Sequence, residues 1–87
     1  MYIILVYDFG ERRVGKILKL CRQYLNRVQN SVFEGEITPS KLLELTTRAE
    51  KFMDEEADSI IIFKSSDVKW LDKTVIGKQV NDLNTII

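Results

Sequence analysis

The chain has 87 residues, with 13 acidic and 13 basic side chains and therefore no net charge. It contains one cysteine and no histidine, which excludes an intrachain disulfide, a zinc site built from Cys and His, and a catalytic triad that needs an imidazole. The length predicts one domain over residues 1–87, and because so short a chain has a small core, a self-complementary dimer is expected. No long apolar run and no leader pattern occurs, so we expect a cytoplasmic protein without a membrane segment.

The first predicted element is a strand over residues 2–8, which is almost fully apolar until Asp8 closes it. A run of this kind predicts a central strand that is buried on both faces. A carboxylate at the end of such a strand must lie in solvent or meet a cation. Asp8 is therefore the first candidate for a functional residue.

A turn over residues 9–11 leads to a helix predicted over about 12–25. Its apolar positions recur at helical spacing, and Cys21 is one of them, so the thiol is predicted to be a small buried hydrophobe. The apolar stripe consists of Val14, Ile17, Leu18, Cys21 and Leu25.

The segment 27–37 has the composition of a strand, with Asn30-Ser31 and Glu34-Gly35 as places where it can turn or kink. It predicts either one kinked strand or a short hairpin. Both alternatives are compatible with an antiparallel sheet.

A second helix is predicted to follow, since Thr38 is a favourable N-cap and Pro39 suits the first helical position. This helix is predicted to end at about Asp54, where an acidic cluster begins. Its buried stripe is predicted to be Leu42, Leu45, Ala49, Phe52 and Met53.

The β-branched run 58–63 predicts another central strand, followed by a polar connection over 65–72 and a short edge strand over 74–77. This order predicts an α+β fold of the ferredoxin-like type, a β-α-β-β-α-β sandwich with both helices on one face of an antiparallel sheet. The tail over about 78–87 ends in apolar residues, and we expect it to dock on its own sheet or on a partner subunit.

The zero net charge conceals a separation along the chain. Residues 11–27 contain six basic side chains and one acidic one, a local net charge of +5, whereas residues 34–58 contain eight acidic and three basic ones, a net charge of −5. Two oppositely charged faces are expected, of which the basic one favours a polyanion. The alternative is a solvated helix face whose charges pair within the molecule.

Several short stretches resemble a known family. They are, in chain order, Tyr7-Asp8, Arg12-Arg13-Val14, the run Val-Gln-Asn-Ser-Val-Phe-Glu-Gly over 28–35, Asp58-Ser59 and Ile76-Gly77. The most specific is the pattern Gln-x-Ser-Val-Phe-x-Gly, which stands between the two predicted helices. Over nearly its whole length the chain resembles CRISPR-associated protein two, the small subunit of the spacer-acquisition machinery.

This resemblance implies a ferredoxin-like homodimer in which the first-strand aspartates of the two subunits approach each other across the two-fold axis. Members of the family have been described as magnesium-dependent endonucleases that act on single-stranded RNA or, for some, on double-stranded DNA. They also bridge two dimers of the integrase subunit in the CRISPR adaptation complex. The expected partners are therefore a second copy of the chain, the integrase subunit, and DNA or RNA.

The chemistry of a phosphodiester agrees with a metal site at Asp8. Carboxylates suit Mg²⁺, or another divalent cation, because hard cations favour oxygen ligands. One Asp per chain is too few, but two copies of Asp8 facing each other would supply two carboxylates to a shared ion. The alternative is that Asp8 caps the first predicted helix.

Further site residues come from the resemblance and from the basic face. By position, Tyr7, Arg13, Arg27, Ser31 and Phe33 match the family residues near the proposed active cleft. The arginines would pair with phosphate oxygens and the serine would donate a hydrogen bond, while the aromatic rings of Tyr7 and Phe33 would stack on a base or pack at an interface. The predicted nucleic-acid contacts are Arg12, Arg13, Lys16, Arg27 and Ser31.

The sequence departs from some relatives in one respect. Those relatives carry two basic residues two positions apart near the start of the first helix, whereas Glu11 stands two positions before Arg13 here. Three hypotheses follow: a metal-dependent nuclease, a non-catalytic DNA-binding scaffold that bridges integrase dimers, and an unrelated ferredoxin-like module for RNA binding or ligand sensing. The acidic segment 34–58 and the tail over 82–87 are candidates for contacting the integrase subunit.

Overall fold

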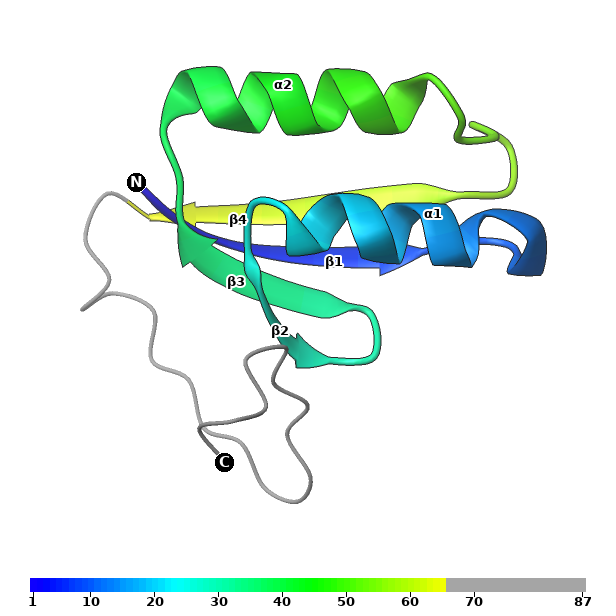
Figure 1. The fold of residues 1–87 in the computed structure, drawn as a ribbon, viewed down its shortest axis with the longest axis horizontal. Helices are drawn as coiled ribbons and strands as arrows, with labels where there is room; N and C mark the ends of the chain where they lie inside the picture. Colours follow the sequence, from blue (N-terminus) through cyan, green and yellow to red (C-terminus); the bar gives the residue numbers. More distant parts are fainter. Residues whose placement is uncertain (66–87) are drawn as a thin grey trace.

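The computed structural model describes residues 1–65. The elements are β1 (Tyr2–Asp8), α1 (Glu11–Arg22), β2 (Asn26–Gln29), β3 (Val32–Glu36), α2 (Pro39–Glu50) and β4 (Ser59–Ser65). The strands form an antiparallel sheet in the order β2-β3-β1-β4, and both helices lie over one of its faces (Figure 1). This confirms the predicted β-α-β-β-α-β arrangement. The strand predicted over 74–77 and the tail over 78–87 lie outside the described residues.

The strand β1 differs from its prediction, because only one of its faces is buried. Ile3, Leu5 and Tyr7 point under the helices and are at most 4% exposed, whereas the alternate residues Ile4 and Val6 are half-buried. Side chains alternate across a pleated strand, and the two described helices cover a single face of the sheet. The prediction of a strand buried on both faces is therefore wrong for the described part of the chain.

The strand β4 pairs with β1 and lies at the edge of the described sheet. It continues to Ser65, the residue at which the polar connection was predicted to begin, and the rest of that predicted connection lies outside the described residues. Ile61 and Phe63 are 54% and 55% exposed on it. The apolar run correctly predicted a strand, but its predicted central position is wrong within residues 1–65, because an apolar run does not identify the neighbours of a strand.

The segment 27–37 forms a hairpin, which decides between the two alternatives left open by the sequence. β2 and β3 pair across a turn at Asn30-Ser31, and a register shift between Arg27 and Gln29 marks a bulge in β2. Glu34-Gly35 lies inside β3 and makes no turn.

Both helices begin close to their predicted starts and end earlier than predicted. α1 ends at Arg22 rather than near residue 25, and α2 ends at Glu50 rather than near Asp54. The predicted N-cap of α2 is confirmed, because the Thr38 hydroxyl accepts a hydrogen bond from the Lys41 amide at 3.2 Å. None of the helices in residues 1–65 is long and apolar enough to cross a membrane.

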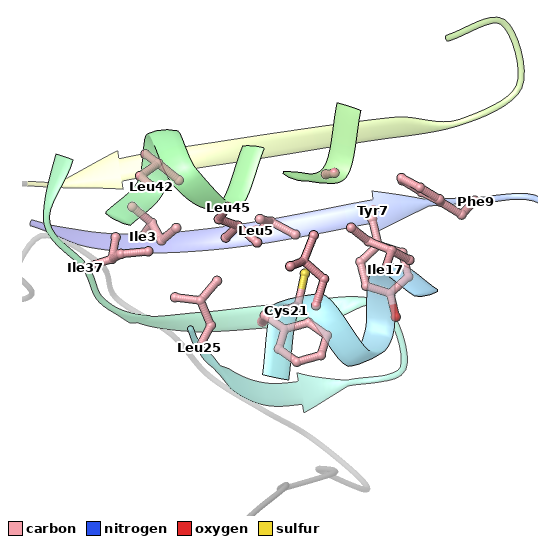
Figure 2. Packing of buried hydrophobic residues seen from close by; sticks show 13 residues of the cluster. Ile3, Leu5, Tyr7, Phe9, Ile17, Cys21, Leu25, Ile37, Leu42 and Leu45 are labelled. Atoms are coloured by element: carbon pink, nitrogen blue, oxygen red, sulfur yellow. The ribbon is translucent and has the colours of Figure 1, made fainter. Parts of the chain in front are cut away.

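The core lies between the sheet and the two helices (Figure 2). Cys21 is fully buried in it, as predicted, and burial raises the pKa of its thiol to about 12. The thiol is therefore protonated at neutral pH, in agreement with a packing role. The largest side chains with almost no exposure are Phe33, Ile3, Leu5, Ile17, Leu45 and Cys21.

Candidate functional site

Asp8 ends β1 with an exposed side chain. Because side chains alternate along the strand, Asp8 lies on the same face as Ile4 and Val6, away from the helices. The N-cap of α1 is Gly10, and no side chain caps the helix from that position. The alternative that Asp8 caps this helix is therefore wrong, and its carboxylate is presented to solvent at one end of the helix-free face.

The helix-free face beside Asp8 carries an apolar cluster, next to which Glu34 of β3 pairs with Ile4. Paired residues of adjacent antiparallel strands point to the same side of a sheet, and the register pairs Ile4 with Phe63 and Val6 with Ile61. Val32 of β3 is the other neighbour of Val6. No described helix covers this side of the sheet (Figure 1). We call this surface the open sheet face and define it as Ile4, Val6, Val32, Ile61 and Phe63.

A second aspartate, Asp58, lies next to the start of β4 and is buried, with no exposed side-chain surface. Its Oδ1 accepts hydrogen bonds from the Gly10 amide at 2.8 Å and from Nη2 of Arg13 at 3.1 Å. Its Oδ2 accepts from the Asp54 amide at 2.9 Å and from Nε of Arg13. Asp58 therefore fixes the start of α1 and the loop before β4 with one side chain.

The two hydrogen bonds from Arg13 hold the pKa of Asp58 well below its ordinary value, against the opposing effect of burial. The amides of Asp54 and Gly10 lower this pKa further. The sequence did not predict this role, since it identified Asp58 only as the residue that opens a strand. The available signal was an acidic residue next to a β-branched run, which is a weak one.

The predicted basic contacts on α1 differ in their surroundings. Arg12 and Lys16 are exposed, so both are accessible to a ligand. Arg13 is half-buried, and its Nε and Nη2 are engaged by Asp58. This ion pair raises the pKa of Arg13. Arg13 therefore has a structural role in this chain, whereas the sequence predicted only a contact with phosphate.

The other predicted polar contacts gather around the turn between β2 and β3. Arg27 donates from Nη2 to the Asn30 carbonyl at 3.3 Å, while its Nε is buried without a hydrogen-bond partner among the described residues. The Ser31 carbonyl accepts from the Tyr7 amide at 3.0 Å, one residue before Asp8. The sheet therefore brings Ser31 close to the end of β1 that carries Asp8.

Tyr7 and Phe33 lie inside the core, where they are 4% and 0% exposed. Their rings stack on each other with centroids 6.1 Å apart. The Tyr7 hydroxyl also donates to the Asn30 carbonyl at 3.1 Å, which ties the β2–β3 turn to β1. In this conformation neither ring is exposed on a surface where a base would stack.

Within residues 1–65, no three acidic, His or Cys side chains lie close enough together to hold a metal ion. Asp8 is the exposed carboxylate that ends β1, and the segments that follow β1 and precede β4 contain further exposed acids, Glu11, Asp54, Glu55 and Glu56. A hollow of about 430 Å³ lies at the opposite end of β1, around Met1, Tyr24 and Ile37. It contains none of the predicted site residues.

Comparison with known proteins places this architecture in a family. Residues 1–73 match the family model described as CRISPR associated protein Cas2. A protein of Methanosarcina acetivorans named CRISPR-associated endoribonuclease Cas2 is 41% identical over 87 residues, which is the full length of both chains. The crystal structure of Streptococcus pyogenes Cas2 is similar with a TM-score of 0.73 and 30% identity, covering 86% of this chain and 99% of that one. Another crystal structure, of a protein called cas2, has a TM-score of 0.76 and 38% identity, covering 91% of this chain and 88% of that one. The family match and this full-length relative show that the chain belongs to the Cas2 family of CRISPR-associated proteins.

Proposed function

We propose that this protein is a metal-dependent endoribonuclease that acts as a homodimer, with Asp8 of both subunits in its catalytic site. The observation that carries the proposal is the exposed carboxylate of Asp8 at the end of the open sheet face. Support comes from the relatives, several of which are named CRISPR-associated endoribonuclease Cas2. Family membership removes the hypothesis of an unrelated ferredoxin-like module.

The open sheet face supports the dimer. Phe63 and Ile61 are more than half exposed, and each apolar side chain of this size gains about 1.5–3 kcal/mol when it is fully removed from water. A two-fold interface is self-complementary, so an apolar face can be covered by a second copy of itself. Such a contact would enlarge the small core of an 87-residue chain.

The dimer also explains how one Asp8 per chain could suffice. Asp8 lies on the same side of β1 as Ile4 and Val6. If this side of the sheet meets its copy, the two Asp8 carboxylates lie at the edge of one shared interface. The site would then be incomplete in a monomer.

The donor chemistry of Asp8 fits a divalent cation. Carboxylate oxygen is the ligand type that Mg²⁺ prefers, and this ion usually keeps several waters beside one or two carboxylates. The two copies of Asp8 would hold it. When bound, such an ion supplies charge neutralisation at the phosphate and activation of a water molecule.

The remaining roles belong to the side chains around Asp8. Arg12 and Lys16 are exposed on α1 and would contact phosphate oxygens of the substrate. Arg27 and Ser31, near the β2–β3 turn, would contact the same strand. The chain has no histidine, so no imidazole is available as a general base.

The test is the variant Asp8→Asn, compared with Glu11→Gln, which removes one negative charge from an exposed position at the start of α1. We expect Asp8→Asn to lower Mg²⁺-dependent cleavage of a labelled single-stranded RNA by at least about a hundredfold, and Glu11→Gln to leave it nearly unchanged. Circular dichroism and size-exclusion chromatography with light scattering check the fold and the dimer. Cleavage that persists in Asp8→Asn would overturn the catalytic role.

A second candidate function is a non-catalytic scaffold that binds DNA and bridges integrase dimers in spacer acquisition. The observation that favours it is the ion pair of Arg13 with Asp58, which commits Arg13 to the fold. The exposed Arg12 and Lys16 remain on α1 to contact phosphates, and such contacts hold DNA without any hydrolysis. If wild-type protein binds duplex DNA and supports spacer integration but cleaves no RNA, this function replaces the first one.

A further inference from the structure

The packing of the two helices brings together basic side chains from segments of opposite net charge. Lys16 and Lys19 project from α1, and Arg48 and Lys51 come from the end of α2 and the residue after it. These four cations line one groove of about 430 Å³ between the helices. Arg48 and Lys51 are two of the three basic residues in the acidic segment 34–58, and packing against α1 places them beside its lysines.

The charged side chains that line the groove are all basic. Its walls consist of these cations together with the polar Gln23 and the apolar Leu20 and Phe52, and no acidic side chain within residues 1–65 lines it. Lys16 and Lys19 stand three residues apart on α1 and thus on the same side, and Arg48 and the C-cap Lys51 have the same spacing at the end of α2. The result is a basic stripe along the helix layer.

Two of the cations are held in position by aromatic and polar neighbours. Nη1 of Arg48 donates to Oε1 of Gln23 at 2.8 Å and to the Tyr24 hydroxyl at 2.9 Å, and the guanidinium lies 5.8 Å from the centre of the Tyr24 ring. The ammonium of Lys16 lies 5.9 Å from the centre of the Phe52 ring. A pre-positioned guanidinium loses less side-chain entropy when it binds an anion.

The donors that face the groove are only partly used within the chain. Arg48 has five N–H groups, and in the described residues Nη1 alone makes hydrogen bonds. Lys19 and Lys51 are exposed, and neither forms an ion pair with a described acid. Glu44 is connected to the stripe through Tyr24, whose hydroxyl donates to the Glu44 carboxylate at 2.5 Å.

We propose that this groove is a second nucleic-acid contact surface, which binds backbone phosphates on the helix layer, on the opposite side of the sheet from Asp8. The proposal rests on the proposed function, since it assumes a nucleic-acid ligand. Four clustered cations fit a polyanion, and several adjacent phosphates match a stripe better than a single small anion does. In this arrangement the groove anchors a strand whose other segment reaches Asp8, so it contributes to affinity and not to the chemical step.

The test compares two double variants with equal loss of charge. Lys19→Gln/Lys51→Gln removes two groove cations, and Lys41→Gln/Lys64→Gln removes two exposed lysines that do not line the groove. The probes are a fluorescent single-stranded RNA of uridines and a duplex DNA of matched length. Binding is followed by fluorescence anisotropy at several salt concentrations, with circular dichroism to confirm folding.

For the groove variant we expect the dissociation constant of at least one probe to rise about tenfold. The slope of log K against log salt should become less steep by about 1.4 for RNA or about 1.8 for DNA, because each phosphate contact contributes about 0.7 on a single strand and 0.9 on B-DNA. The control variant should change both quantities much less. In cleavage assays the groove variant should raise KM and leave kcat nearly unchanged.

The outcomes separate this proposal from the proposed function. Equal effects of the two double variants on the binding of both probes would overturn the proposal that the groove binds phosphates. Cleavage that survives Asp8→Asn, together with a groove effect on binding, would overturn the catalytic proposal and leave the groove standing. A wild-type protein that binds neither probe would overturn both.

Discussion

Asp8 and Asp58 lie at the same end of the sheet, beside neighbouring strands, and have opposite surroundings. Asp8 is paired in register with Ser59, the residue that follows Asp58, yet Asp8 is exposed and Asp58 has no exposed side-chain surface. Side chains alternate across the strands, so one carboxylate points away from the helices and the other points under them. Asp58 is one residue away from the register partner of Asp8, and this shift of one residue places it on the other side of the sheet. It separates a candidate catalytic carboxylate from a structural one.

The comparison shows what each environment allows. The carboxylate of Asp58 accepts hydrogen bonds from two backbone amides and from Arg13, which is the condition under which a buried charge is tolerated. Such a group is committed to the fold and is closed to a ligand. Asp8 stabilises little at its exposed position and is open to a cation, to substrate or to a second subunit.

The largest expected effect on stability comes from Asp58→Asn. The amide keeps the shape of the side chain but removes the charge that Arg13 faces and places an N–H group among hydrogen-bond donors. We expect Tm to fall by roughly 10 °C, since a domain of this size loses several degrees for each lost interaction of moderate strength. Thermal unfolding followed by circular dichroism measures the change.

Asp8→Asn is the matched control, because it makes the same chemical change at an exposed position of the same sheet end. Its Tm should lie within about 2 °C of wild type. If both variants lose similar stability, the contrast between a structural and a functional aspartate is wrong.

The pH dependence of stability should also show that the Asp58 charge supports the fold. The folded-state pKa of Asp58 is depressed below its ordinary 3.8, mainly by the hydrogen bonds from Arg13. Its contribution to stability is therefore complete above the unfolded-state pKa and is lost as the pH falls toward the folded-state pKa. We expect the Tm difference between wild type and Asp58→Asn to stay constant from about pH 7 to 5 and to shrink below about pH 4.

This comparison of two pH profiles cancels the titration of the other acids, which both proteins share. It is measured by thermal unfolding between about pH 2 and 7 in buffers of equal ionic strength. Profiles that remain parallel down to pH 2 would mean that the Asp58 charge does not support the fold.

The sequence was sufficient for the parts of the fold that depend on local patterns. The apolar run before Asp8 predicts a strand, and Thr38-Pro39 predicts the start of α2 to the residue, because caps and periodicity act within a few positions. Asp8 was also found as a candidate from its position alone. The family resemblance supplied its expected partner, a second copy of itself.

Other features could not be predicted because they depend on which elements become neighbours. The pairing of Asp58 with Arg13 joins residues 45 positions apart. Within residues 1–65, the edge position of β4 follows from the strand order, which a run such as 58–63 does not encode. The basic groove likewise requires α2 to pack beside α1, which brings Arg48 next to lysines from the other helix.

The smallest expected effect tests whether Asp8 depends on the open sheet face. In Phe63→Ser an exposed ring of that face is removed, and burial of the ring in a dimer is worth about 1.5–3 kcal/mol. We expect the dimer dissociation constant to rise at least about tenfold, with little change in the Tm of the subunit. Sedimentation velocity over a range of protein concentrations measures the dissociation constant.

Leu43→Ser is the control, because Leu43 is 67% exposed but lies on α2, away from the open sheet face. It should leave the dimer intact. Cleavage by Phe63→Ser should fall at low protein concentration and recover at high concentration, because the proposed Asp8 site would be shared between two subunits. A Phe63→Ser monomer that cleaves RNA as fast as wild type would show that one Asp8 works alone. Asp8 would then differ from Asp58 only in its exposure to solvent, and a second subunit would contribute nothing to its function.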